Sequence, residues 1–120
     1  MGRATADLMD DYLTMWENGS LPGITESLHP DVDFEAGTVR LTGRGRVAAA
    51  FASVLAQLSA FHVRSTFVCG NDAMFASEWM CTPPIGRCRI AELVTFEDGL
   101  VKRIELFCDA KAFGHIVKDA

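Results

Sequence analysis

The sequence predicts an α+β fold in which three N-terminal helices pack on a curved, mostly antiparallel sheet, forming a cone with an internal pocket. Two observations predict this fold. In the first half of the chain, apolar residues recur every three or four positions, which is the spacing of one helix face. In the second half, apolar and polar residues alternate in four runs joined by short turns, which is typical of antiparallel strands. Helices that are segregated from a sheet in this way cover one of its faces.

The first predicted helix runs from about Thr5 to Asn18. Its apolar residues recur at spacings of three and four and form one broad stripe. The Asn18-Gly19 pair ends the helix, since these residues accept the left-handed backbone found at helix C-termini. The stripe consists of Leu8, Met9, Tyr12, Leu13 and Trp16.

Two further helices are expected before the main sheet. Ser20 is a suitable N-cap for a short helix that has Pro22 in its first turn, where the missing N–H costs little. The His29-Pro30 pair stops this helix, because the residue before a proline avoids helical geometry. The third helix is alanine-rich and runs from 47 to 58, after a loop at 43–45.

The rest of the chain is predicted to be β structure, apart from a last short helix at 110–117. Short turns rich in Asn, Asp, Pro and Gly separate the longer runs, so neighbouring strands are antiparallel. The expected strands are 32–36, 39–41, 61–69, 74–82, 87–96 and 100–107.

The composition describes one domain that spans residues 1–120. Hydrophobic residues make up 49% of the chain, which excludes a disordered protein, and the net charge of −5 disfavours nucleic-acid binding. No apolar run is long enough to span a bilayer, and the N-terminus turns acidic where a signal peptide turns apolar. We therefore expect a soluble, cytoplasmic protein that binds neither nucleic acid nor a membrane.

The four cysteines, Cys69, Cys81, Cys88 and Cys108, are spread along the chain without a Cys-x-x-Cys motif. Buried, reduced thiols are the simplest interpretation. A Cys81–Cys88 bridge and a thiol nucleophile remain open alternatives. Neither histidine nor cysteine falls at metal-ligand spacing, so no metal site is expected.

Glu92 is an acid on an otherwise apolar strand face, because it alternates with Ile90, Val94 and Phe96. If this face lines an interior, burial raises the pKa of Glu92, and such perturbed acids are candidates for function. Two other interpretations stay open. The face could be the solvated or dimer-facing side of the sheet, or Glu92 could pair with a basic residue such as Arg103.

The register between the strands expected at 74–82 and 87–96 determines which residue stands opposite Glu92. A tight hairpin with Thr82 opposite Arg87 would place Ser77 opposite Glu92 on one mostly apolar face. A shift by one residue would instead pair Glu78 with Glu92, and like charges directly opposite each other are destabilising. The first register is therefore expected.

Two segments carry a resemblance to a known family: YLTMWENGSLPGITESLHPDVDFEAG near the start and ELVTFEDGLVKRIELF near the end. In this order they resemble the nuclear-transport-factor-like superfamily of cystatin-like α+β cones, in its SnoaL-like and ketosteroid-isomerase-like branch. The superfamily includes isomerases, polyketide cyclases, epoxide hydrolases and non-catalytic binding domains. The resemblance implies no cofactor, and it implies a homodimer formed through the convex face of the sheet.

Two residues match the isomerase site by this resemblance. Tyr12 takes the place of the family's oxyanion-hole tyrosine, and Glu92 falls where the family has a protonated aspartic acid. A neutral acid and a phenol both donate hydrogen bonds to an enolate oxygen. The family's base, an aspartate on the first short strand, aligns with Ala36, and Asp33 and Glu35 are expected to point the other way. An ordinary core tyrosine is the alternative for Tyr12.

The sequence thus predicts a pocket for a small hydrophobic molecule with an oxygen function, such as a polyketide, a terpenoid or a steroid-like ring. The first hypothesis is a cofactor-independent isomerase or cyclase that uses Tyr12 and Glu92. The second is a non-catalytic binding or dimerisation domain. A third, water addition to an epoxide, requires Glu105 and Arg103 to enter the pocket. The expected pocket walls are Trp16, Phe34, Phe51, Trp79, Val94, Phe96 and Phe107.

Overall fold

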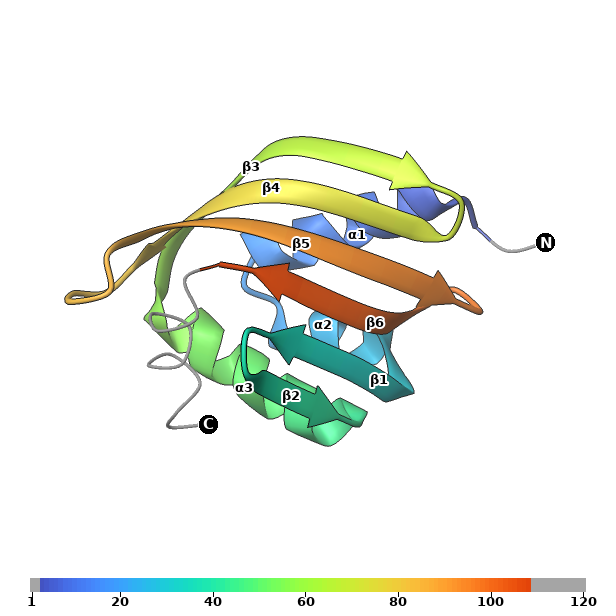
Figure 1. Cartoon of the computed structure of the whole chain (residues 1–120), viewed down its shortest axis with the longest axis horizontal. Coiled ribbons are helices and arrows are strands. Elements are labelled where there is room, and N and C mark those ends of the chain that lie inside the picture. The colour runs from blue at the N-terminus through green and yellow to red at the C-terminus, as the bar shows by residue number, and fades with distance from the viewer. Residues whose placement is uncertain (1–2, 109–120) are drawn as a thin grey trace.

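The computed structural model describes residues 3–108, so the helix expected at 110–117 lies outside the described residues. Three helices and six strands follow the predicted order (Figure 1). The helices are α1 (Thr5–Glu17), α2 (Leu21–Ser27) and α3 (Arg44–Gln57). The strands are β1 (Leu28–Ala36), β2 (Val39–Thr42), β3 (Leu58–Cys69), β4 (Asp72–Cys81), β5 (Arg87–Glu97) and β6 (Leu100–Phe107).

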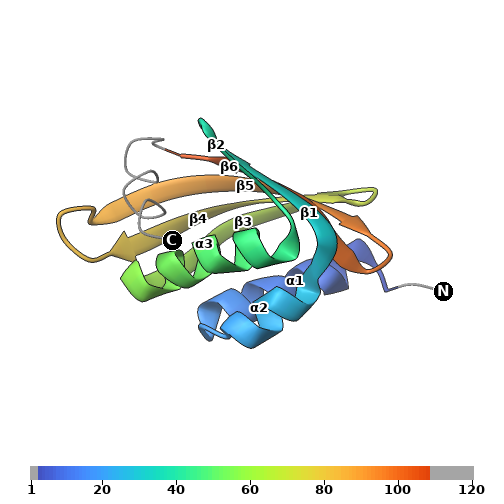
Figure 2. The same ribbon diagram turned by 90° about the horizontal axis from the view of Figure 1, so that it is seen from below.

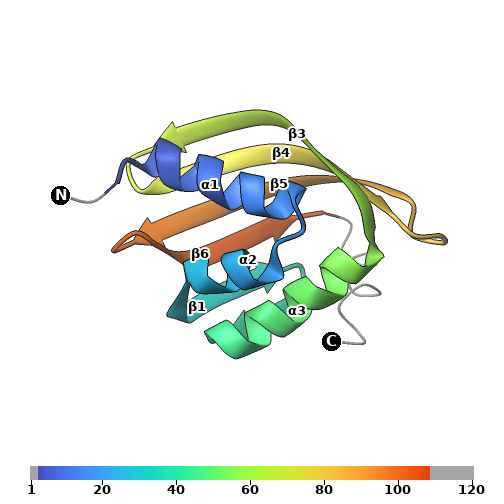
Figure 3. The same ribbon diagram turned by 180° about the vertical axis from the view of Figure 1, so that it is seen from behind.

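The strands form one open sheet in the order β2-β1-β6-β5-β4-β3, in which only β1 and β6 are parallel. The sheet is curved, and all three helices cover its concave face (Figure 2). Helix α1 packs on the β3–β4 side and α3 on the β1 side, with α2 between them (Figure 3). The predicted α+β class, the three helices and the mostly antiparallel curved sheet are confirmed.

Three elements begin three or more residues before their predicted starts: α3, β1, and β3, which begins at Leu58 instead of 61. Helix α3 begins at Arg44 instead of 47, because Gly43, with a φ of +97°, turns the chain directly into the helix. The Arg44 guanidinium donates two hydrogen bonds to the Leu28 carbonyl, at 2.9 and 2.5 Å. Strand β1 begins at Leu28 instead of 32, since the backbone before Pro30 favours an extended conformation. The predicted cap of α2 is confirmed: Ser20 Oγ accepts a bond from the Gly23 N–H.

The register between β4 and β5 is shifted by two residues from the expected one. The last pair of the ladder is Met80 with Arg87, not Thr82 with Arg87. The reason is a tertiary contact: the Thr82 N–H donates to the Gln57 carbonyl at the end of α3, so it leaves the sheet early. A shift by two residues keeps every side chain on its predicted face. Glu92 therefore still faces the helices, but it stands opposite Phe75 instead of Ser77.

The core fills the space between the helices and the concave face of the sheet. Buried and more exposed side chains alternate along β4, where Phe75, Ser77 and Trp79 point inward. Only two buried residues within 3–108 are polar or charged, namely Ser77 and Glu92. Every other buried residue of this part of the chain is hydrophobic, so polar atoms in the core are exceptions that require a reason.

Candidate active site

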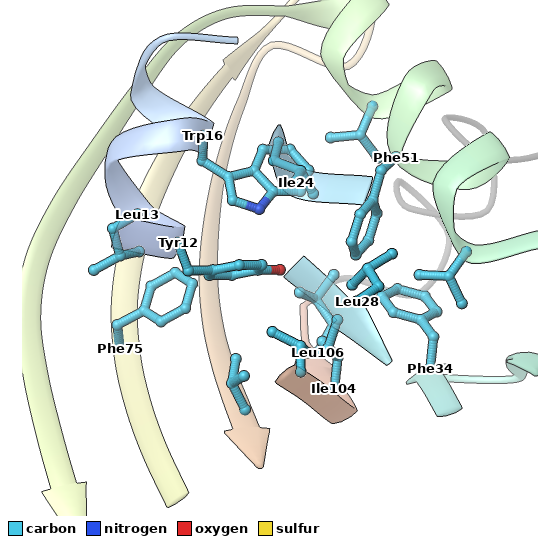
Figure 4. Close-up of a cluster of buried hydrophobic side chains, with 14 of the residues drawn as sticks. Tyr12, Leu13, Trp16, Ile24, Leu28, Phe34, Phe51, Phe75, Ile104 and Leu106 are labelled. Carbon is cyan, nitrogen blue, oxygen red and sulfur yellow. The ribbon is translucent and has the colours of Figure 1, made fainter. Parts of the chain in front are cut away.

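Tyr12 and Trp16 enter the interior from α1. They are four residues apart, which places them on one face of the helix, and their exposed fractions are 1% and 3%. The Tyr12 hydroxyl and the Trp16 indole nitrogen point into the same part of the core, toward Phe51 and Leu28 (Figure 4). The two rings meet edge to face, with centroids 6.4 Å apart. Trp16 was predicted only as a residue of the pocket wall, but its indole N–H points toward the Tyr12 hydroxyl (Figure 4).

Glu92 enters the same interior from the sheet. Its side chain is 3% exposed, and its neighbours on the adjacent strands are Phe75 on β4 and Leu106 on β6. This position excludes a solvated face, and it also excludes pairing with Arg103, which lies on the opposite side of the sheet. The interpretation of Glu92 as an interior acid is confirmed.

Burial sets the protonation of this pair. Removal from water raises the pKa of Glu92 to about 8, and the nearby Tyr12 hydroxyl partly opposes the shift. The pKa of Tyr12 is raised well above its usual range, first by burial and then by the Glu92 charge, while the Trp16 indole N–H acts in the opposite direction. At neutral pH the interior therefore holds mainly a carboxylic acid and a phenol, and both can donate hydrogen bonds.

Five buried polar atoms have no hydrogen-bond partner within the described part of the chain. Tyr12 lies close enough to influence the carboxyl electrostatically, yet its hydroxyl forms no well-aligned hydrogen bond. Each such atom costs about 1–3 kcal/mol of desolvation, so a cluster of them is typical of a site that binds a polar group. The atoms are Tyr12 Oη, Trp16 Nε1, Ser77 Oγ, Trp79 Nε1 and Glu92 Oε2.

Six of the seven expected wall residues lie in the same core. Trp16 is central to them: its ring centroid lies 5.0 Å from that of Phe51, edge to face, and 6.1 Å from that of Trp79, stacked. The expectation for Phe107 is wrong, because this residue is 51% exposed on the outer face and Leu106 takes the inward position. The six buried residues are Trp16, Phe34, Phe51, Trp79, Val94 and Phe96.

The buried side chains of β1 are all apolar. Val32, Phe34 and Ala36 point inward from β1 and are buried, whereas Asp33 and Glu35 point outward. No residue of the described β1 therefore brings a carboxylate into the interior.

The acid–arginine cluster that the epoxide hypothesis requires in the pocket lies on the outer face of the sheet. The Arg103 guanidinium is 2.7 Å from the Glu105 carboxylate and 3.9 Å from that of Glu35. A hollow of about 290 Å³ opens beside it and is also lined by Asp33 and Arg40. Glu105 and Arg103 are thus separated from Glu92 by the sheet itself, and the carboxylate pair required for the epoxide hypothesis does not form in the interior.

Within 3–108, no group of three or more His, Cys, Asp or Glu side chains could hold a metal ion. Cys81 is buried but Cys69 is exposed, so the expectation of buried thiols holds for only part of the set, and none of the four forms a disulfide within 3–108. Burial and the neighbouring Cys88 raise the pKa of Cys81 to about 11, which disfavours a thiolate nucleophile. No described helix is both long and apolar enough to cross a bilayer.

Comparison with known proteins now identifies the family. The family model for the SnoaL-like domain matches residues 9–104, which is most of the chain. The chain belongs to the SnoaL-like family. No curated protein is similar enough in sequence to match this SnoaL-like chain.

Solved structures confirm the fold. A steroid delta-isomerase from Pseudomonas aeruginosa superposes with a TM-score of 0.82 at 16% identity, covering 96% of this chain and 89% of that one. A candidate polyketide cyclase from Sinorhizobium meliloti gives 0.75 at 17%, covering 87% and 99%. A de novo designed protein with a curved β-sheet gives 0.81 at 23%, covering 96% and 92%. The SnoaL-like fold is therefore shared by proteins of different roles, and the function must be argued from the site.

Proposed function

We propose that the interior of this SnoaL-like domain binds a small, largely apolar molecule with a carbonyl-type oxygen and acts on it by acid–base chemistry of the isomerase or cyclase type. One observation carries the proposal: Tyr12 from α1 and Glu92 from β5 meet in an apolar core, and both retain an unpaired polar atom. Side chains supply both hydrogen bonding and proton transfer, so the reaction requires no cofactor.

The chemistry follows from the pKa of Glu92. With a pKa of about 8, roughly a tenth of the molecules carry an ionised Glu92 at pH 7. That carboxylate removes a proton from the carbon next to the carbonyl, and the C–H electron pair forms an enolate. Tyr12 and Trp16 donate hydrogen bonds to the enolate oxygen. Glu92 then returns its proton to another carbon, which gives an isomer, or to an alkoxide formed by ring closure.

This assignment makes Glu92 the proton carrier because Ala36 offers no second base. Glu92 is the only buried ionisable carboxyl in the described chain. The names of two similar structures, a steroid delta-isomerase and a candidate polyketide cyclase, support a polyketide or steroid-like ligand.

Exchange of the α-protons of 2-tetralone for deuterium, followed by proton NMR in D₂O, tests the proposal. We expect the wild-type protein to accelerate exchange and Glu92→Gln to lose the acceleration. Tyr12→Phe should lower the rate by roughly 10²-fold, the usual effect of removing one oxyanion donor. Glu35→Gln, on the opposite face of the sheet, is the matched control and should leave the rate unchanged. Equal rates for the wild type and Glu92→Gln would contradict the catalytic proposal.

The alternative is a non-catalytic binding domain, and the buried Ala36 favours it. In that case 2-tetralone would still bind and quench the emission of Trp16, but Glu92→Gln would leave the exchange rate unchanged. Measuring binding and exchange on the same samples therefore separates the two functions.

We also propose that the outer face of the sheet pairs with a second copy of this chain. Met74, Met80 and Phe107 expose apolar side chains there. The face is also self-complementary in charge. At the β3–β5 end three arginines surround one carboxylate, whereas acids outnumber arginines at the β1–β6 end, so a twofold arrangement would join unlike ends. The charged residues are Arg64, Glu78, Arg87 and Arg89 at the first end and Asp33, Glu35, Arg40, Arg103 and Glu105 at the second.

A further inference from the structure

A second pair of polar groups lies in the same interior. Ser77 and Trp79 are two residues apart on β4, so both side chains face the helices, and each is 2% exposed. Neither Ser77 Oγ nor Trp79 Nε1 has a hydrogen-bond partner within residues 3–108. The acid–base mechanism uses neither group, so both remain without a role.

Ser77 and Trp79 lie further along β4 than Phe75, the residue opposite Glu92. Glu92 stands opposite Phe75, and Ser77 is the next inward residue of β4, so Ser77 lies diagonally across from Glu92. Diagonal neighbours in an antiparallel pair are about 7–8 Å apart. The two side chains leave the sheet at different points, so Ser77 can hold a ligand oxygen other than the one beside Tyr12. Trp79 lies one step further along β4 and stacks on Trp16.

Ser77 and Trp79 are hydrogen-bond donors, so they favour a ligand atom that accepts hydrogen bonds. An indole N–H can only donate a hydrogen bond, and a serine hydroxyl can donate one as well. Among the described residues no lysine, arginine or histidine is buried beside them, so a carboxylate or phosphate would lack a counter-charge. A neutral oxygen, as in a ketone, an ether or an alcohol, fits this environment.

We propose that Ser77 and Trp79 form a second polar site that binds a second, neutral oxygen of the ligand. The inference rests on the proposed function, since Tyr12 and Trp16 hold the first oxygen there. The ligand is then an apolar skeleton with two separate oxygen functions. Specificity for such a molecule comes from the far oxygen, because an analogue without it leaves two buried donors unpaired.

Two matched ketones test the proposal: 6-methoxy-2-tetralone and 6-ethyl-2-tetralone, which differ only in an oxygen or a methylene at the far end. The chain has two tryptophans, so the indole region of a ¹H–¹⁵N spectrum holds one signal each for Trp16 and Trp79, and Trp79→Phe assigns them. Both ketones should shift the Trp16 signal. Only the methoxy ketone should shift the Trp79 signal downfield, and it should bind about 5-fold tighter, as one neutral hydrogen bond predicts.

Ser77→Ala should remove this preference and leave the affinity for the ethyl ketone unchanged. Ser65→Ala, an exposed serine on β3, is the matched control and should keep the preference. Equal affinities in the wild type, with only the Trp16 signal shifted, would overturn the second site and leave the proposed function intact. If neither ketone binds, both proposals are contradicted.

Discussion

Ala36 and Glu92 lie in the same row of the sheet, two strands apart, with Leu106 of β6 between them. All three side chains face the concave side. The row therefore contains one acid where a two-carboxylate site would have a second group at the Ala36 position. Two strand spacings separate the backbones of Ala36 and Glu92 by about 10 Å.

Ala36→Asp should convert the row into a two-carboxylate site. The introduced carboxylate can take the α-proton while protonated Glu92 and Tyr12 both donate to the oxygen. We expect exchange of 2-tetralone to accelerate by roughly 10²-fold, the usual contribution of a positioned base. Ala36→Asn has a similar size but no base, so it should share the loss of stability without the gain in rate. Equal rates for the two variants would show that position 36 does not face the bound ketone.

The stability of the protein should depend on pH through Glu92. Its pKa in the folded state is about 8, above the ordinary value of 4.5, so the folded state retains a proton that the unfolded chain releases. The free energy of unfolding should therefore fall as the pH rises from about 5 to 8 and then level off. Glu92→Gln should remove this slope, which amounts to about 4 kcal/mol across the whole range.

Urea unfolding between pH 5 and 9 measures this effect. Ser77→Ala is the matched control, since it changes a neighbouring buried polar residue that does not titrate, and it should keep the wild-type slope. A Glu92→Gln variant with the same slope as the wild type would show that Glu92 is ionised in the folded protein.

The outer face should control the oligomeric state. Phe107→Glu places a charge in the centre of the proposed interface, so sedimentation should show a dimer for the wild type and a monomer for the variant. Val68→Glu is the control, because Val68 is also exposed but belongs to the opposite face of β3. A wild-type monomer at micromolar concentration, or a Phe107→Glu dimer, would argue against pairing through this face.

Much of the fold was predictable because it depends on local patterns. The stripe of α1, the cap at Ser20 and the alternation around Glu92 each indicate a structure without knowledge of distant residues. The inward position of Glu92 was predictable for the same reason: a strand that is apolar at every second position has only one buried face.

The wrong predictions concern features that depend on contacts between residues distant in the sequence. The β4–β5 register depends on Thr82 bonding to Gln57, a contact that no local pattern reveals. Phe107 follows Leu106 in a strand that is apolar on both faces at its end, so hydrophobicity alone could not select the inward residue. The free indole N–H groups of Trp16 and Trp79 were missed because spacing gives the face of a residue but not the direction of its polar atom.

The central claim is that Glu92 is a protonated acid held beside Tyr12, and a ¹³C NMR titration of the Glu92 carboxyl tests it most directly. We expect a pKa of about 8 in the wild type, raised by burial. In Tyr12→Phe it should rise further, since the Tyr12 hydroxyl lowers it. A pKa near the ordinary value of 4.5 in both proteins would contradict the claim.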